Sequence, residues 1–462
     1  MSLAVGENLR IATTIAAVQN RGESKLTASS GISEDPVPPH CRNPYLRYRW
    51  QARTNLELGK KSASRPRPAL YLAILWMILS FACGRAAKTK SGPAADFGAE
   101  AKLLYRVVAC SGSAALPANI DPQIVDRHCQ QLKPRMERYR RGYLARATPF
   151  LAALRPSNLP DTVVYPFGGG DLLAALTTYP HARRIITLSL ELSGDPRRIT
   201  NIDNARLDQS LDVVDHNIGG LLKANDSTTE TLMDTQQGDL PGQLSYFLVA
   251  LAVHGFEPVA LRYFHVQPDG SLHYYSREEV HAMETRRAGA RHGKWTSPDF
   301  SEAFANSELV FRPVNSDGPL RVHRHIGANL RDDSLRSNGP ILTYLRKQGQ
   351  VAAMTKAASY CLWNPRFSRI RNYLLSNMVF MISDGTGIPP ELARQAGFVQ
   401  ETYGSFEGAM CFDDCPSTEY NDQFRELWAS QPKRKLGFRY GYVDSKHSAH
   451  LLVTRRAPLA KL

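Results

Sequence analysis

The distribution of apolar and polar residues divides the chain at about residue 97. From there to residue 456, apolar positions recur at the two-residue spacing of strands and at the wider spacing of helices. Ahead of this region lie a proline-containing tail over residues 1–68, a continuous apolar run over residues 69–83 and a polar tether over residues 84–96. The pattern therefore predicts one α/β domain over residues 97–456, preceded by three segments of different character.

The domain is expected to begin with a long helix and to continue as alternating strands and helices. Helices are predicted over residues 121–154 (broken or kinked near Pro134), 172–178, 203–224, 241–254 (capped by Asp239), 341–347, 351–362 and 389–396. Strands are predicted over residues 162–165, 184–190, 257–266, 271–275, 309–311, 320–325, 377–382, 436–442 and 449–454, and a surface loop over residues 277–307.

The succession of strand, helix and strand over residues 162–190 is a βαβ unit. Such a unit implies parallel strands joined by a right-handed crossover. No repeat of fixed period is visible in the chain. The fold class that follows is α/β, a single mixed sheet with a Rossmann-like βαβ unit and a helical lead-in.

The apolar run over residues 69–83 has Ser80 as its one polar residue and follows four basic residues, Lys60, Lys61, Arg65 and Arg67. At about 1.5 Å per residue it is shorter than the roughly 20 residues that cross the hydrocarbon of a bilayer. Basic flank, apolar run and small residues occur in the order of a signal peptide. We therefore expect export, with membrane association through residues 69–83. The alternative is a buried core helix.

Cys83 is a candidate lipidation site. Cleavage after Ala82 would make it the first mature residue, as in a bacterial lipoprotein signal, where this cysteine carries the lipid. Ser80 and Phe81 depart from the aliphatic and small residues that the lipoprotein pattern has at these positions. The expected location is the cell envelope, either membrane-associated or periplasmic.

The basic charge of the chain is concentrated in its tail. The formal net charge is +14, and residues 1–68 hold 11 Lys and Arg against 5 Asp and Glu. Either the tail is an unstructured cytoplasmic segment or translation starts further downstream. The remaining surplus of +8 is spread without any block of like charges, so no nucleic-acid partner is expected.

The cysteines and histidines do not predict a metal site. Cys411 and Cys415 form the closest cysteine pair, and a disulfide between them is possible outside the cytosol. His323 and His325 lie on one face of a predicted strand, while His265 and His273 are expected to face each other across a hairpin. No carboxylate or third ligand is tied to either pair by its spacing.

A glycine loop over residues 167–171 carries the most suggestive chemistry. Its three glycines, Gly168, Gly169 and Gly170, lie between a strand and a helix. Exposed backbone amides at such a place can donate hydrogen bonds to an anionic ligand. Glu191 follows the next strand, at the place where Rossmann-like proteins position an acid against a ribose. These four residues are candidate cofactor-binding residues, with the cofactor unknown. The alternative is a structural turn, because neither G-x-G-x-x-G nor a Walker lysine is present.

A second loop over residues 383–389 also follows a buried strand and precedes a helix. Ligand crevices in parallel sheets lie beyond the carboxyl ends of strands, so the two loops are expected to border one cleft. Asp171 and Asp384 are then candidate catalytic residues, acting as an acid and a base. The alternative is that Asp384 caps its turn while the glycines supply positive φ.

Four motifs occur in order along the chain: Phe167-Gly-Gly-x-Asp171, Lys356-Ala-Ala-Ser-Tyr360, Phe367-Ser-Arg-Ile-Arg371 and Ser383-Asp-x-x-Gly-Ile-Pro389. This pattern resembles a family of uncharacterised bacterial envelope proteins that are often lipoprotein-like. The resemblance covers roughly residues 160–445. It implies export and a single domain, and it implies no particular activity.

Two functions follow as expectations. The first is an exported, membrane-associated envelope protein that binds a ligand or a protein partner. The second is a Rossmann-like enzyme, methyltransferase-like, that uses the glycine loop at residues 167–171. Export favours the first, because nucleotide cofactors are kept in the cytosol. The sequence leaves open whether the chain is an enzyme.

Overall fold

The computed structural model describes residues 92–224, 239–288, 301–337, 339–358, 362–407, 418–441 and 449–457. The apolar segment at residues 69–83, its Cys83, and the pair Cys411 and Cys415 lie outside the described residues. Residues 88–462 form one compact unit, to which the description below is confined. Among the described helices, none has both the length and the apolar composition that a membrane crossing needs.

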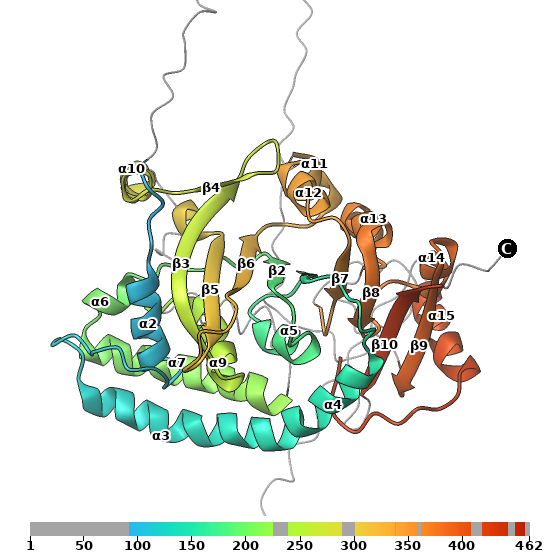
Figure 1. Ribbon diagram of the computed structural model, residues 1–462, viewed down its shortest axis with the longest axis horizontal. Helices are drawn as coiled ribbons and strands as arrows, with labels where there is room; N and C mark the ends of the chain where they lie inside the picture. Colours follow the sequence, from blue (N-terminus) through green and yellow to red (C-terminus); the bar gives the residue numbers. More distant parts are fainter. Residues whose placement is uncertain are drawn as a thin grey trace, which may run out of the picture. The chain divides into compact units, whose positions relative to one another are not determined.

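A ten-stranded mixed sheet runs through this unit, in the order β4-β3-β5-β6-β2-β1-β7-β8-β10-β9 (Figure 1). Its strands are β1 Thr162–Pro166, β2 Arg184–Ser189, β3 Phe256–Val266, β4 Leu272–Tyr274, β5 Ser307–Pro313, β6 Arg321–Gly327, β7 Val351–Met354, β8 Met378–Ser383, β9 Phe398–Gly404 and β10 His450–Arg456. The five strands from β6 to β8 are mutually parallel, and the flanking strands pair antiparallel. The predicted α/β class with a single mixed sheet is confirmed.

The described helices precede, follow or connect these strands. They are α2 Gly98–Val107, α3 Pro122–Tyr139, the π-helix η2 Arg140–Leu144, α4 Ala145–Leu154, α5 Leu172–Thr178, α6 Arg198–Asn201, α7 Asn204–Ala224, α9 Gly242–Val253, α10 Arg277–Ala288, η4 Glu302–Phe304, α11 Asp332–Ser337, α12 Gly339–Arg346, η5 Pro365–Phe367, α13 Ser368–Asn377, α14 Pro390–Gln395 and α15 Thr418–Ser430. The predicted helical lead-in is therefore present as α2, α3, η2 and α4.

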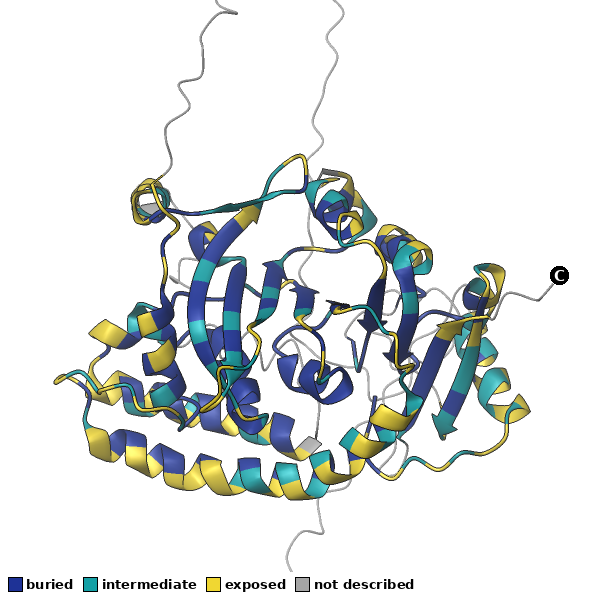
Figure 2. Cartoon of the chain, in the orientation of Figure 1, coloured by how far each residue is buried: buried dark blue, intermediate teal, exposed yellow. Residues whose placement is uncertain are grey.

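Two apolar layers enclose the sheet, because neighbouring residues of a strand point to opposite faces. Val163 and Tyr165 of β1 pack with α2, α3, α4, α5, α7 and α9, whereas Val164 packs with α11, α12, α13 and α14. The burial colouring in Figure 2 shows the buried strands between these partly exposed helices. The sheet and its two helical layers fix the positions of the loops at the strand ends.

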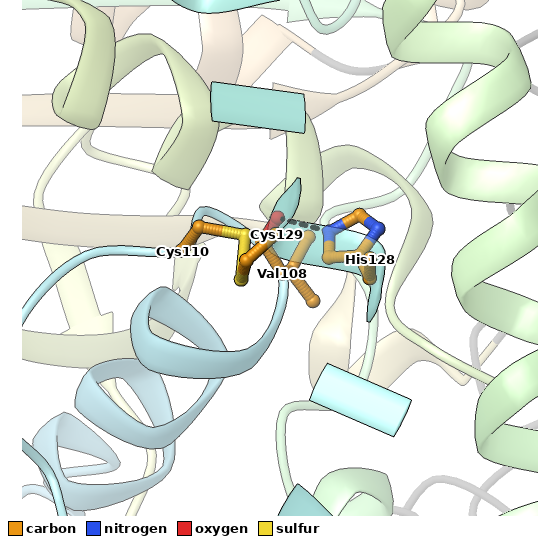
Figure 3. Close-up of a disulfide and its surroundings, with 4 residues drawn as sticks. All are labelled: Val108, Cys110, His128 and Cys129. Carbon is orange, nitrogen blue, oxygen red and sulfur yellow. Dashed lines mark hydrogen bonds between the residues drawn. A yellow bond between two sulfur atoms is a disulfide. The ribbon is translucent and has the colours of Figure 1, made fainter. Parts of the chain in front are cut away.

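A disulfide between Cys110 and Cys129 joins the end of α2 to α3, with Cα atoms 5.4 Å apart (Figure 3). Beside it, the ring of His128 hydrogen-bonds through Nε2 to the carbonyl oxygen of Val108 at 3.0 Å. Burial lowers the pKa of His128. The cross-link and the hydrogen bond both tie α3 to the segment that follows α2.

The first long helix, predicted to be broken or kinked near Pro134, is not broken there. Pro134 lies inside a continuous α3, and the helix changes character six residues later, in the π-helix at residues 140–144. There Arg140 donates from Nε to the carbonyl oxygen of Val253 at 2.9 Å and from Nη2 to that of Ala252 at 2.7 Å. These bonds satisfy carbonyl oxygens at the end of α9. The π-helix therefore lies where Arg140 contacts α9 and not at the proline.

Two predicted elements have a different secondary structure. Residues 351–354 form the buried strand β7 instead of the start of a helix, because their apolar side chains face both layers of the core. A short apolar run fits a strand and a helix equally well, so its periodicity does not distinguish them. Residues 436–441 are not a strand, although Phe438 and Tyr440 are buried two residues apart. β9, which the sequence analysis missed, takes the place beside β10.

Two smaller predictions are also wrong. The segment expected as a loop over residues 277–307 contains the helix α10, whose first turn carries Glu278 and Glu279. Asp239 does not cap α9, since its Oδ1 accepts from Nη2 of Arg198 at 2.7 Å. An ion pair with a distant arginine therefore replaces the local cap.

Candidate functional site

Three polar loops meet at one edge of the sheet. β7 lies between β1 and β8 and is parallel to both, so the carboxyl ends of the three strands are neighbours. Asp171 follows β1, Lys356 follows β7 and Asp384 follows β8. All three residues are buried. The structure thus brings the two predicted aspartates to the same edge, with a lysine loop between them.

Asp171 forms an ion pair with Lys356, with Nζ 2.7 Å from Oδ2 and the lysine side chain only 1% exposed. The same carboxylate accepts from the hydroxyl of Tyr165 at 3.1 Å. Its Oδ1 accepts from the backbone amide of Ala174 at 3.0 Å, so Asp171 is also the N-cap of α5. Burial of an ion pair is tolerated when further hydrogen bonds satisfy it, and these bonds do so.

Asp384 is fully buried and holds two loops at once. Its Oδ2 accepts from the backbone amide of Ala357 at 2.7 Å, and its Oδ1 accepts from the amide of Thr386 at 2.9 Å and from the Thr386 hydroxyl. The bonds to Thr386 are those of an aspartate that caps its own turn. The bond to Ala357 links the β8 loop to the β7 loop, next to Lys356.

The glycines of the second loop are needed for space and not for positive φ. A Cβ on Gly385 would lie 2.4 Å from Cε2 of Phe406, and one on Gly387 would lie 2.3 Å from Oγ of Ser383. Neither glycine is among the residues with positive φ. The alternative in which these glycines supply positive φ is therefore wrong.

The glycine loop after β1 packs against the protein itself. A Cβ on Gly168 would meet the ring of Tyr165 at 2.9 Å, and one on Gly170 would meet Oε1 of Gln243 at 2.9 Å. Gly169 has a φ of +47°. The close approach that glycine permits here is made by the protein's own side chains, and Gly169 serves the turn through its backbone conformation.

Two residues in these loops adopt left-handed backbone conformations without being glycine. Phe167 has a φ of +60° and Ala357 a φ of +46°. Such conformations cost about 1–3 kcal/mol each and gather at binding and catalytic sites. Their occurrence on two adjacent loops of one sheet edge marks this edge as the candidate site.

Glu191 lies beyond the carboxyl end of the strand next to β1. It follows β2, the neighbour of β1, and the amide of Gly168 donates to the carbonyl oxygen of Leu188 at 3.2 Å. Glu191 is only 4% exposed, and its backbone oxygen hydrogen-bonds to Nε2 of His325 at 2.8 Å. Its proposed role against a ribose stays a prediction.

Three further residues of this edge were not among the predicted site residues: Lys356, Tyr440 and His450. Burial and the charge of Asp384 raise the pKa of Tyr440, whose hydroxyl has no hydrogen-bond partner among the described residues. Burial lowers the pKa of His450, against the opposing charge of Asp384. The sequence indicates two of these residues. Lys356 and His450 each lie at the end of an apolar strand, where a charged or imidazole side chain is rarely buried without a partner.

This arrangement brings acidic, basic and neutral proton-carrying groups together out of water. Two carboxylates, an ammonium group, an imidazole and tyrosine hydroxyls surround the ends of three parallel strands. Groups of these types bind charged ligands and move protons. In the described conformation, Asp171 and Lys356 interact with each other, so a charged ligand would have to compete with an existing ion pair.

The histidine pairs lie on their strands as predicted. His323 Nε2 and His325 Nδ1 both hydrogen-bond to the hydroxyl of Thr187, at 2.9 and 3.0 Å. His265 and His273 are cross-strand partners in the hairpin of β3 and β4. Among the residues that the structure describes, no group of three or more His, Cys, Asp or Glu side chains has the geometry to hold a metal ion.

The fold and this edge define an α/β protein with a mixed sheet and a buried polar cluster at the carboxyl ends of its central strands. No family model, no curated protein and no solved structure matches the chain. The arguments for function therefore come from the chain itself.

Proposed function

We propose that the chain is an exported, membrane-associated envelope protein whose α/β domain binds a ligand or a protein partner. The observation that carries this proposal is the disulfide between Cys110 and Cys129. Disulfides form and persist in oxidising compartments and are rare in the cytosol. The apolar run at residues 69–83 supplies a route to such a compartment.

The ligand site in this proposal is the carboxyl edge of β1, β7 and β8. Loops at this edge carry the buried pair of Asp171 and Lys356, the buried Asp384 and the two strained residues Phe167 and Ala357. Rigid parallel strands position such loops accurately, and ligands of α/β proteins bind there. Packing alone gives no reason for so many buried polar groups at one edge.

Export is tested by fusing residues 1–100 to a reporter enzyme that is active only outside the cytoplasm. We expect activity, because the basic flank and apolar run should engage the export machinery. A matched fusion in which Leu75 and Leu79 are replaced with Arg should lose that activity, since charges in the apolar core oppose insertion. Equal activity from both fusions would contradict export through this segment.

The mode of attachment is a separate part of the same experiment. Cys83→Ser in the full chain should move the protein from the membrane fraction to the soluble envelope fraction if Cys83 carries lipid. An unchanged distribution would leave residues 69–83 as a helical anchor or a cleaved signal. Either result leaves the reporter assay as the test of export itself.

A Rossmann-like, methyltransferase-like enzyme is the second candidate, and the strand order favours it. The five parallel strands lie across the sheet in the order β6-β2-β1-β7-β8. If they are numbered by their order in the chain, this is 3-2-1-4-5, which is the order of doubly wound nucleotide-binding sheets. The order reverses between β1 and β7, and such sheets bind ligands at this point. The close packing of Gly168 and Gly170 against Tyr165 and Gln243 speaks against an open cofactor cradle.

A thermal-shift assay of the full chain separates the two candidates. S-adenosylmethionine or a nicotinamide or adenine nucleotide in hundredfold excess over its Kd should stabilise the enzyme by about 2.7 kcal/mol. Glu191→Ala should reduce that shift if the carboxylate holds a ribose, while Gly169→Val should unfold the turn because of its φ of +47°. No shift with any compound at millimolar concentration would exclude the cofactor function.

A further inference from the structure

A groove on the helical side of the domain is lined by more basic than acidic side chains. It lies between the end of α3, the π-helix η2 and the second half of α7, with a volume of about 930 Å³. Its basic side chains are Arg135, Arg138, Arg146, Lys223 and Arg439, and its acidic ones are Asp212 and Asp215. We propose that this groove binds a small phosphate ester.

The cations of the groove differ in how firmly they are held. Arg135 donates from Nη1 to the carboxylate of Asp215 at 2.7 Å and to its carbonyl oxygen at 3.0 Å. Arg146 donates to the carbonyl oxygens of Gly142 and Gly437 at 2.8 and 2.9 Å. Arg138 and Lys223 are exposed and have no carboxylate partner among the described residues. Fixed and unpaired cations therefore share one groove.

The helix α7 contains two adjacent glycines, Gly219 and Gly220, where it borders the groove. A glycine inside a helix costs about 1 kcal/mol relative to alanine, so a pair within one helix needs compensation. A Cβ on Gly219 would lie 2.6 Å from Nη1 of Arg135, whereas a Cβ on Gly220 would meet nothing within 4 Å. Gly219 thus leaves room for the guanidinium of Arg135 against α7, and Gly220 keeps the groove open.

The π-helix forms the opposite wall. π-helical turns are rare and occur frequently at functional sites. Here the turn places Gly142 and Tyr143 at the groove, and Tyr143 stacks on Tyr139 with ring centroids 5.0 Å apart. Burial and the charges around it, including that of Asp171, raise the pKa of Tyr139. Tyr139 and Tyr143 thus add aromatic side chains to the basic lining of the groove.

The charge and size of the groove select the ligand class. A phosphate monoester carries about two negative charges at neutral pH, which suits the surplus of basic over acidic side chains. Arginine is the side chain best suited to phosphate oxygens because of its planar array of donors. A volume of about 930 Å³ exceeds what a free inorganic ion needs, so the phosphate should carry an organic group.

Calorimetric titration of the full-length protein tests this inference, with inorganic phosphate, glucose 6-phosphate and glucose as probes. We expect saturable binding of glucose 6-phosphate, weaker binding of inorganic phosphate and none of glucose. Arg138→Glu and Lys223→Glu should each weaken binding by about tenfold or more, corresponding to about 1.4 kcal/mol. Gly219→Ala should weaken it as well by displacing Arg135.

Lys133→Glu is the matched control, because Lys133 is exposed on the same helix as Arg138, lies outside the groove and changes the net charge equally. Equal loss in Lys133→Glu and Arg138→Glu would overturn the inference, since it would show a diffuse charge effect only. Binding to phosphatidylglycerol vesicles without binding to glucose 6-phosphate would also overturn it, as would no binding at millimolar concentration. The inference is independent of export, so the reporter fusion and this titration can fail separately.

Discussion

Replacing Lys356 with Met is expected to lower the free energy of unfolding by about 3–5 kcal/mol, because it leaves the carboxylate of Asp171 buried without its cation. The pair is only 1% and 9% exposed at its two side chains, so water cannot take the place of the ammonium group. Methionine matches the volume of the lysine stem, which separates the loss of charge from a loss of packing. Urea denaturation followed by tryptophan fluorescence measures the change.

Two variants control this experiment. Lys347→Met removes a lysine whose Nζ lies 3.6 Å from Asp269, in a pair with both side chains about half exposed or more, and should cost less than about 1 kcal/mol. Asp171→Asn combined with Lys356→Met should recover much of the loss, since asparagine remains a good N-cap without a buried charge. If Lys356→Met costs no more than Lys347→Met, the ion pair does not hold the site together.

Removing the disulfide with Cys110→Ser and Cys129→Ser should lower the free energy of unfolding by about 3 kcal/mol, the cost of freeing a loop of this length in the unfolded chain. The two cysteines are 19 residues apart and join α2 to α3, which make up the first part of the helical lead-in. Denaturation of the oxidised wild type and of the double variant, under the same conditions, gives the difference.

A reductant provides the control for this prediction. Dithiothreitol should destabilise the wild type by a similar amount and leave the double variant unchanged, because the variant has no bond between these positions to lose. Thiol labelling of denatured, unreduced protein should find Cys110 and Cys129 blocked. Free thiols at both positions in protein taken directly from cells would remove the observation on which the export proposal depends.

The sequence predicted the elements whose patterns had a single interpretation. The helix at residues 172–178 and the hairpin of His265 and His273 matched the structure, because a capping aspartate and a Pro-Asp-Gly turn determine local geometry. The run at residues 351–354 has no such signal, and its burial on both faces is a property of the assembled sheet. The error at this strand hid Lys356 as well, since a residue predicted in a helix was not considered a strand-end group.

Other features depend on contacts between distant parts of the chain and have no local signal. Cysteine spacing does not reveal connectivity, so the sequence analysis considered the close pair Cys411 and Cys415 and missed the disulfide between Cys110 and Cys129. Likewise, the sequence placed Asp171 and Asp384 at strand ends, but their connection through the β7 loop needs the order of strands in the sheet. The groove beside α7 was missed because Gly219 and Gly220 indicate by themselves only weak helix positions.

The position of β7 in the sheet has a consequence for how the chain folds. β1 meets β2 soon after it is made, yet its other neighbour is encoded about 190 residues later, beyond β3, β5 and β6. Contacts that span so much of the chain must overcome a large loop-closure entropy, which slows folding. Until β7 has paired with β1, the backbone groups on one side of β1 are unpaired and can pair with another strand. Slow folding would keep the chain unfolded for longer and so accessible to the machinery of the export proposed above. It would also make the yield of folded protein depend on chaperones.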